Sequence, residues 1–282
     1  MRFIEDRISV ICNELKELAF VKKEPVNGVV YKKGLYFYPH EADESAKPWE
    51  EFDSKTMHWY GPDEHYWFRA QYTVPKSMDG KTLYLKVATQ VDHWDYARNP
   101  QFLLFVNGQM TQGMDINHQT VMLEKSAKEG DTYTIDLQGY TGVMFAELTF
   151  TMEAVEVDER INEIYYDIVV PLQGFSRMQE DDKVRKDLRT PYSEEFYQSI
   201  EEARNYIQKA LYEDMSGYED VIATCIGHTH IDVAWLWTVA QTREKVARSF
   251  STVLKYMDEY PGYRFMSSQP ALYQFLKERY PE

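Results

Sequence analysis

Residues 221–237 read VIATCIGHTHIDVAWLW, and this stretch decides how the last part of the chain is expected to fold. Its first part, residues 221–226, is continuously apolar or small and does not alternate with polar residues. A strand of a parallel sheet has this composition because helices cover both of its faces. Three polar side chains follow Gly227 at alternate positions: His228, His230 and Asp232. The stretch therefore predicts a buried parallel strand with a polar loop at its carboxyl end.

The residues after this stretch predict a helix, a second strand and a second helix. Residues 242–258 form the first helix, because Phe250, Leu254 and Met257 keep helical spacing and a Tyr-Pro-Gly sequence follows. Residues 265–268 predict a short strand, and residues 271–280 predict another helix. This order is typical of the opening βαβα portion of a parallel α/β domain. Three basic residues of the first helix are expected on its solvated face: Arg243, Lys245 and Arg248.

The polar loop has the composition of a metal site. In an extended segment, residues two apart project to the same side, so His228, His230 and Asp232 would face one way. Imidazole nitrogen and carboxylate oxygen suit a zinc-like divalent ion, and α/β enzymes place their sites at this end of the strands. Trp235 and Trp237 would form an aromatic wall beside it. The alternative is a structural cluster in which Asp232 caps the next helix and the tryptophans belong to the core.

The N-terminal half of the chain predicts one helix and many short strands. Apolar residues recur at three- and four-residue steps over residues 2–19, which predicts an amphipathic helix: Ile4, Ile8, Ile11, Leu15 and Leu18. From Gly28 to about Phe175, short apolar runs are separated by turn signals, including Asn107-Gly108, which predicts a type I′ hairpin. Seven or more such strands indicate an antiparallel β-sandwich of jelly-roll type.

These patterns predict an α+β multidomain chain with four parts. They are an N-terminal helix at 1–25, a β-sandwich at 26–175, a charged linker and helix at 176–218, and the start of a parallel α/β domain at 219–282. Two strands cannot close a parallel sheet, so we expect the chain to be the front of a larger protein. Ser193 is the expected N-cap of a helix in the third part, which buries five residues: Phe196, Ile200, Ala203, Ile207 and Leu211.

Composition limits the classes of function. The net charge of −15 argues against nucleic acid or an anionic membrane as a partner, since both require a basic surface. The high aromatic content, with 22 Tyr, 14 Phe and 6 Trp, suits a core and also the faces of neutral sugars. Cys12 and Cys225 are expected to be reduced, buried thiols. Neither a secretory signal nor a membrane span is found, so a cytoplasmic location is expected.

The last quarter of the chain resembles a known enzyme family. GHTHIDVAWLWT, TREKVARSFSTVLKYMDEYPGYRF and SSQPALYQFLKERYPE follow one another from about Cys225 to Glu282. Together they resemble glycoside hydrolase family 38, the class II α-mannosidases, and in particular their cytosolic and bacterial branch. The upstream sequences YWFRAQYTVP and DYARNPQFLLFVNG resemble the N-terminal β-domain of that branch. The resemblance implies that residues 219–282 begin a (β/α) barrel catalytic domain that the chain does not complete.

The resemblance also assigns roles to the polar loop. The second histidine and the aspartate of the motif bind zinc in the family, which implies His230 and Asp232 here. His228 would then contact the metal ligands without binding the metal itself. Trp235 would line the subsite of the mannose that is cleaved. Family members are retaining enzymes of α-mannoside hydrolysis, and their nucleophile and remaining zinc ligands are expected beyond residue 282. This chain by itself is therefore expected to be inactive, and a homodimer is expected by analogy.

Two functions of different classes remain open at this stage. The first is the N-terminal part of a zinc-dependent α-mannosidase. The second is a carbohydrate-binding, lectin-like jelly-roll module without catalysis. A loop at residues 93–100 carries aromatic, acidic and basic side chains that would suit sugar binding, although Asn-Pro within it is also an ordinary turn signal. The helix after the motif departs from the family at residues 241–245, where Gln-Thr-Arg-Glu-Lys replaces Glu-Thr followed by Arg-Lys, so no role is assigned to its charges.

Overall fold

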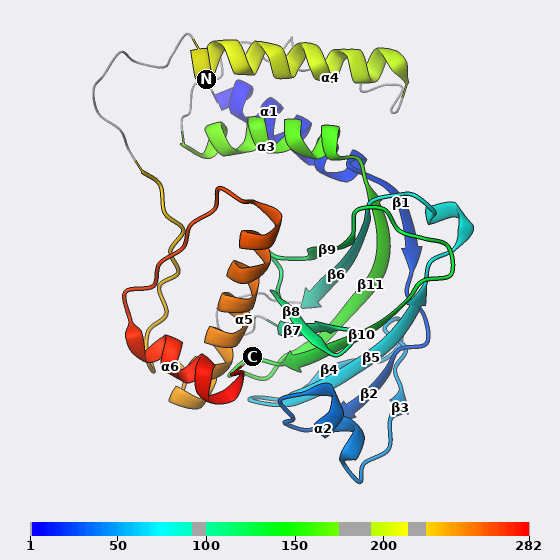
Figure 1. Cartoon of the computed structure of the whole chain (residues 1–282), viewed down its shortest axis with the longest axis vertical. Helices are drawn as coiled ribbons and strands as arrows, with labels where there is room; N and C mark the ends of the chain where they lie inside the picture. Colours follow the sequence, from blue (N-terminus) through cyan, green and yellow to red (C-terminus); the bar gives the residue numbers. More distant parts are fainter. Residues whose placement is uncertain (1, 92–99, 175–192, 214–223, 282) are drawn as a thin grey trace. The chain divides into compact units, whose positions relative to one another are not determined.

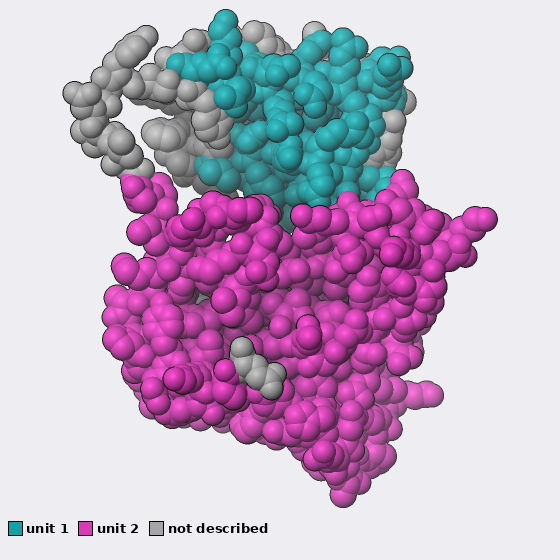
Figure 2. Space-filling view, in the orientation of Figure 1, with its two compact units in different colours: residues 1–23, 155–223 teal, residues 24–154, 224–282 magenta. Residues whose placement is uncertain are grey.

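The computed structural model describes residues 2–91, 100–174, 193–213 and 224–281 and divides the chain into two compact units. The first unit comprises residues 1–23 and 155–223, and the second comprises residues 24–154 and 224–282 (Figure 2). The second unit therefore joins the central part of the chain to its C-terminal segment.

The first unit is helical. Helices α1 (Arg2–Leu18), α3 (Glu159–Gly174) and α4 (Glu194–Ile207) are followed by a π-helical turn, η3 (Gln208–Glu213). The three helices share one apolar cluster, built from Ile8, Ile11 and Leu15, from Ile161, Ile164 and Ile168, and from Phe196, Ile200, Ala203 and Ile207. The predicted helix at residues 2–19 is confirmed. The side chains of Ile4 and Leu211 lie outside the part of the structure that is described.

Helix α3 was not anticipated, because it lies within the range 26–175 that was assigned to the sandwich. Its residues include several isoleucines and valines, which are common in strands. The three- and four-residue steps from Ile161 to Ile164 and Ile168 are nevertheless helical, and all three side chains are fully buried. Packing against the other helices thus outweighs the local strand preference. The predicted cap of α4 is confirmed, because the Ser193 hydroxyl accepts a hydrogen bond from the Phe196 backbone N–H.

Within the described residues, the β-structure consists of two antiparallel sheets (Figure 1). The five-stranded sheet has the order β1 (Phe20–Pro25), β11 (Glu147–Val157), β6 (Leu83–Val91) and β9 (Thr120–Glu124), with β4 (Trp59–Tyr60) also paired to β11. The six-stranded sheet has the order β3 (Glu50–Glu51), β2 (Val30–Lys33), β5 (His65–Thr73), β10 (Thr132–Tyr140), β7 (Gln101–Val106) and β8 (Gln109–Met114). The registers are antiparallel in the six-stranded sheet and at the β6–β9 and β4–β11 pairs. The prediction of antiparallel β-structure is confirmed.

Strand β7 shows how the six-stranded sheet is buried on both faces. Phe102 and Leu104 point into the core between the two sheets, whereas Leu103 and Phe105 point the other way. Alternate residues of a strand face opposite sides, so a strand that is covered on both sides must be apolar throughout. The QFLLFV sequence satisfies that requirement. The hairpin to β8 turns at Asn107 and Gly108, with φ values of 52° and 80°, which confirms the predicted type I′ turn.

Two short helices complete the central part of the chain: α2 (Pro39–Glu44) and the 3-10 turn η1 (Lys76–Met78). The outer face of the six-stranded sheet carries a second apolar cluster, in which Trp67, Leu103 and Phe105 contact Ala247 and Tyr280 from the C-terminal segment. This cluster attaches the C-terminal segment to the sheet.

The C-terminal segment contains helices α5 (Val239–Glu259) and α6 (Pro270–Arg279), in agreement with the predicted helices. The two predicted parallel strands meet only at one parallel bridge, between Gly227 and Phe265. Residues 224–226 are exposed and lie in no strand, so the expectation of a buried strand is wrong for them, and residues 221–223 lie outside the described residues. A parallel strand is buried only between paired neighbours, and the described residues supply a single bridge.

The two cysteines differ in their surroundings. Cys12 is buried as expected, and its burial raises the pKa of the thiol. The expectation for Cys225 is wrong, because this free thiol is exposed. It lies in the segment that was expected to be a buried strand, so the two corrections have the same cause.

Helix α5 lies along β8 (Figure 1), and its contact with Gly113 of that strand is at Arg248, one of the residues expected to be solvated. Arg248 is only 8% exposed, whereas Leu254 and Met257 are 55% and 36% exposed. The expectation of a solvated position is therefore wrong for Arg248, whereas Arg243 and Lys245 are partly exposed. The orientation is explained by Gly113 of β8, where the absence of a side chain lets the strand approach the helix backbone at Arg248. Among the helices in the described ranges, none combines the length and apolar character needed to span a bilayer.

Candidate functional site

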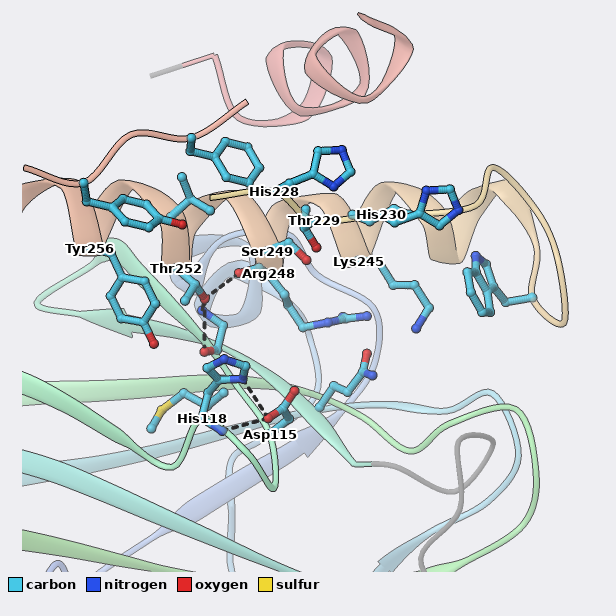
Figure 3. A pocket seen from close by; sticks show the side chains of 18 residues that line it. Asp115, His118, His228, Thr229, His230, Lys245, Arg248, Ser249, Thr252 and Tyr256 are labelled. Atoms are coloured by element: carbon cyan, nitrogen blue, oxygen red, sulfur yellow. Dashed lines mark hydrogen bonds and ion pairs between the residues drawn. The ribbon is translucent and has the colours of Figure 1, made fainter. Parts of the chain in front are cut away.

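The motif segment follows the Gly227 bridge and ends at helix α5. Within it, His230 Nε2 lies 3.0 Å from Asp232 Oδ1, and the two side chains are 70% and 47% exposed. Alternate spacing thus brings these two predicted ligands together. His228 is exposed on the same segment (Figure 3). It does not complete a three-ligand site, because no group of three or more His, Cys, Asp or Glu side chains suited to a metal occurs in the described part of the chain.

The pair is compatible with one divalent ion. Two ligands of a tetrahedral ion, each at about 2.1 Å from it, lie about 3.4 Å from one another, close to the observed separation of His230 and Asp232. Imidazole and carboxylate are also suitable ligand types for zinc. The donor set therefore fits half of a tetrahedral site. The pair can equally hydrogen-bond to each other, which is the structural role considered above.

Asp232 does not cap the helix that follows, so that part of the structural alternative is wrong. Thr238 is the N-cap of α5, and its side chain accepts from the Gln241 backbone N–H. The Gln241 side chain in turn accepts from the Thr238 backbone N–H, which completes a capping box. The Asp232 carboxylate is therefore not needed at the helix start.

The two tryptophans of the motif have different environments. Trp235 is 64% exposed, which excludes a core position. Trp237 is partly buried, and its ring lies edge-on to that of Trp235, at 5.5 Å between centroids and an angle of 86°. The ammonium of Lys245 lies 4.4 Å from the Trp237 ring centroid, within range of a cation–π contact. Trp235 is thus an exposed aromatic side chain three residues after Asp232 in the same segment.

A cavity of about 360 Å³ lies between the motif segment, helix α5 and the turn after β8 (Figure 3). His228 and His230 line it from the motif, Lys245 and Arg248 from α5, and Asp115 and His118 from the turn. Figure 3 shows the Lys245 and Arg248 side chains directed toward the turn that carries Asp115 and His118. His230, a predicted metal ligand, therefore lines the same cavity as Asp115 and His118, which precede it by more than a hundred residues.

Burial and pairing set the charges around this cavity. Burial lowers the pKa of Lys245 to about 8, and the neighbouring Arg248 acts in the same direction. Burial also opposes the ionisation of Asp115, but the hydrogen bond to His118, at 3.1 Å, holds the pKa of that carboxyl below its usual value. The same bond raises the pKa of His118. Sequence reasoning missed all four residues, because their proximity depends on packing between distant segments and no local pattern indicates it.

Helix α5 is fastened to the sheet by polar contacts. The Gln241 amide donates to Asp63 Oδ1 at 2.6 Å and also contacts the Tyr140 hydroxyl. One turn later, His65 Nε2 lies 3.0 Å from a Glu244 carboxylate oxygen. Although burial raises the pKa of Glu244, the His65 hydrogen bond and nearby arginines lower it to a net value below its ordinary range. The start of α5, and with it the motif loop, is thereby fixed relative to the six-stranded sheet.

The loop at residues 93–100, which was considered for sugar binding, lies outside the described residues except for Pro100, which is buried. Its interpretation as a core turn or as a binding loop stays a prediction. The jelly-roll topology and the barrel also stay predictions.

The part of the chain that carries the motif is similar to known proteins. Residues 220–282 match the N-terminal domain of glycosyl hydrolases family 38. The chain is 27% identical to alpha-mannosidase G from Dictyostelium discoideum, over 94% of this chain and 25% of that protein. It is 47% identical to the alpha-mannosidase of Saccharomyces cerevisiae and 46% identical to alpha-mannosidase 2C1 of Homo sapiens, each over 20% of this chain and 5% of the relative. The chain thus spans about a quarter of the length of the first of these relatives and far less of the other two.

Proposed function

We propose, on the premise that residues 220–282 belong to the N-terminal domain of glycosyl hydrolases family 38, that the protein hydrolyses terminal α-mannosides of oligosaccharides. The observation that carries the proposal is the His230–Asp232 pair, with the exposed side chain of Trp235 in the same segment. The three relatives described above are each called an alpha-mannosidase, which supports the choice of sugar.

The residues of this chain would bind and orient the sugar. The Trp235 ring would pack against the apolar face of the mannose, because axial C–H bonds of a sugar suit an aromatic face. His230 and Asp232 would hold a zinc ion with one nitrogen and one oxygen ligand. When bound there, zinc acts as a Lewis acid that holds adjacent sugar hydroxyls. His228, on the same exposed segment, would orient the ligand pair and not bind the ion.

The cavity beside the motif supports a hydroxyl-rich ligand. Arg248 and Gln101 both line it, and each has a buried polar atom, Arg248 Nη2 and Gln101 Oε1, that has no hydrogen-bond partner within the described residues. A sugar hydroxyl both donates and accepts, so hydroxyl groups suit a guanidinium donor as well as an amide acceptor. The part of an oligosaccharide next to the cleaved mannose would lie against this wall.

We infer from the family resemblance that the chemical step uses groups outside these 282 residues. A retaining glycosidase uses one carboxylate as nucleophile and a second carboxyl as acid and base. We expect both in the portion of the protein that this chain does not cover, since the chain corresponds to about a quarter of the Dictyostelium relative. None of the acidic residues around the cavity is assigned to either role.

The test is turnover of an aryl α-mannoside by the full-length protein, with and without exhaustive chelation. His230→Ala is expected to lower kcat/KM by more than about 100-fold, as expected for loss of a metal ligand. His58→Ala is a matched control, because it removes an exposed histidine far from the motif in sequence. The 282-residue chain is expected to bind zinc weakly, since two protein ligands are too few for a structural site.

Two results would contradict the proposal. One is turnover that survives both chelation and His230→Ala in a folded protein. The other is mannose binding by the full-length protein without any turnover, which would instead support the lectin-like alternative.

A further inference from the structure

The hydroxyl of Thr242 makes hydrogen bonds to the motif segment that precedes helix α5. Thr242 is fully buried on the first turn of α5. Its Oγ1 accepts from the Ala234 backbone N–H at 3.2 Å and from the Trp237 indole N–H at 3.2 Å. The hydroxyl itself donates to the Thr238 carbonyl, also at 3.2 Å. A hydroxyl has one donor and two acceptor positions, so all of its hydrogen-bonding capacity is used.

The two groups that donate to Thr242 lie on either side of Trp235. Ala234 precedes Trp235 and has a φ of 60°, in the left-handed region that a Cβ atom disfavours. Trp237 follows Trp235 by two residues, and its ring packs edge-on against the Trp235 ring at 5.5 Å. A non-glycine residue keeps this conformation only where its surroundings impose it. The bond from Ala234 to Thr242 is the contact that imposes it here.

Thr242 is in turn held on a rigid frame. The neighbouring Gln241 bonds to Asp63, and Glu244 bonds to His65, so the first turns of α5 are fixed to the six-stranded sheet. The Thr242 hydroxyl therefore links the exposed Trp235 loop to the sheet through the helix.

We propose that Thr242 is a positioning residue that sets the orientation of the Trp235 ring for the sugar. The inference rests on the proposed function for the identity of the ligand, but the geometry of the loop does not depend on it. Asp232 lies two residues before Ala234, so the same hydroxyl also restrains the end of the loop that carries the metal ligand. The competing explanation is that Thr242 matters only because its methyl group packs in the interior.

Two substitutions of Thr242 separate these explanations. Thr242→Val keeps the volume and the methyl group but replaces the hydroxyl with a second methyl, and Thr242→Ser keeps the hydroxyl but removes the methyl. Ser251→Ala is the matched control, because it removes another buried hydroxyl of α5, which donates to the Arg248 carbonyl and does not contact the loop. Trp237→Phe is a second variant that removes one of the two donors and leaves the buried threonine in place.

The first readout needs no enzymatic activity. The 282-residue chain labelled with 5-fluorotryptophan gives a ¹⁹F NMR resonance for each of its 6 tryptophans. Trp235→Phe and Trp237→Phe identify the two loop resonances. Thr242→Val is expected to shift or broaden both, whereas Thr242→Ser and Ser251→Ala leave both in place. Trp237→Phe is expected to shift the Trp235 resonance.

The second readout is aryl α-mannoside hydrolysis by the full-length protein. Thr242→Val is expected to lower kcat/KM by about tenfold, mainly through a higher KM, which corresponds to the loss of about one hydrogen bond. Thr242→Ser is expected to restore kcat/KM to within about twofold of the unchanged protein. Ser251→Ala is expected to leave both constants unchanged.

The outcomes distinguish the inference from the proposed function. Unmoved loop resonances in folded Thr242→Val, or equal impairment of the Ser and Val variants, overturn the positioning role. If Thr242→Val does not fold, an unmoved Trp235 resonance in Trp237→Phe overturns it as well. If the unchanged full-length protein does not hydrolyse mannosides, the proposed function fails, and the ¹⁹F spectra then decide the positioning of Trp235 alone.

Discussion

Replacement of Gly113 by alanine tests how closely the six-stranded sheet holds helix α5. Gly113 lies in β8, where its backbone N–H donates to the Thr252 hydroxyl at 3.1 Å. A Cβ atom at this position would lie 2.4 Å from the Arg248 carbonyl oxygen and 2.8 Å from the Arg248 carbonyl carbon. Both are backbone atoms in the middle of a helix, so they cannot rotate away. The helix and the strand must separate to admit the methyl group.

The expected cost follows from this displacement. Carbon and oxygen atoms approach to about 3.3 Å at closest, so the separation needed is about 1 Å. Inserting a methyl group into a packed contact costs about 1–3 kcal/mol, and loss of the Gly113–Thr252 hydrogen bond adds about 1 kcal/mol. Alanine offsets about 0.4–1 kcal/mol of this by restricting the unfolded chain. We expect a net loss of about 1–3.5 kcal/mol, with a central value of about 2 kcal/mol, in the free energy of unfolding.

Tryptophan fluorescence measures this loss in the relevant unit. All 6 tryptophans lie in residues 24–154 or 224–282, so their emission reports on the second unit only. For a unit of this size, the expected loss lowers the thermal midpoint by about 5–10 °C. Gly262→Ala is the matched control, because a Cβ atom there would meet nothing within 4 Å. A midpoint for Gly113→Ala that equals the control, with unchanged hydrogen exchange along α5, would refute the reasoning.

Two further predictions concern the pH dependence of the same midpoint. The folded-state pKa of Glu244 is lowered, so this carboxylate stabilises the fold above its ordinary pKa of 4.5, and that stability is lost as the pH falls through 4.5 toward the folded value. Glu244→Gln is therefore expected to flatten the fall of the midpoint between about pH 5 and pH 3, and an unchanged slope would contradict the depressed pKa. The pKa of Lys245 is lowered from 10.5 to about 8. The buried charge therefore lowers the free energy of unfolding below pH 8, and this destabilisation disappears as the pH rises from 8 to 10.5. Lys245→Met is expected to raise the midpoint at neutral pH, with an advantage that shrinks above pH 8, and a constant difference up to pH 10 would exclude the low pKa.

The parts of the fold that the sequence predicts are those determined by neighbouring residues. Ser193 caps its helix because the group that it bonds, the Phe196 N–H, is three residues away. The Asn107-Gly108 turn is local in the same sense, since both residues supply the positive φ that the hairpin needs. Alternate spacing also placed His230 beside Asp232 without knowledge of the fold. Each of these features depends on a pattern a few residues long.

The features that sequence reasoning missed depend on contacts between distant segments. Helical spacing predicted α5 correctly, but it could not show which side faces β8. That choice is made by Gly113, which admits the helix backbone at Arg248, more than a hundred residues further along the chain. A basic residue on a helix is normally solvated, so Arg248 was assigned to the surface, and Cys225 was assigned to the interior because its neighbours are apolar. For Arg248 a tertiary contact with β8 reverses the conclusion, whereas Cys225 is exposed because the described residues supply only one strand bridge beside it.

The polar character of the α5 contact explains how a sheet can orient a site without taking part in its chemistry. Apolar contacts such as Ala247 against Trp67 supply burial but tolerate small shifts of one surface over the other. The bonds from Gln241 to Asp63 and from Glu244 to His65 do not, because each needs its two atoms within about 3 Å and leaves a buried polar group unpaired if it breaks. These two bonds fix the rotation of the helix about its axis and its distance from the sheet at the end that joins the motif segment. The orientation of Trp235 then follows from a series of hydrogen bonds that begins at the sheet. Loss of any one of these bonds is expected to move the Trp235 ring even where the protein still folds.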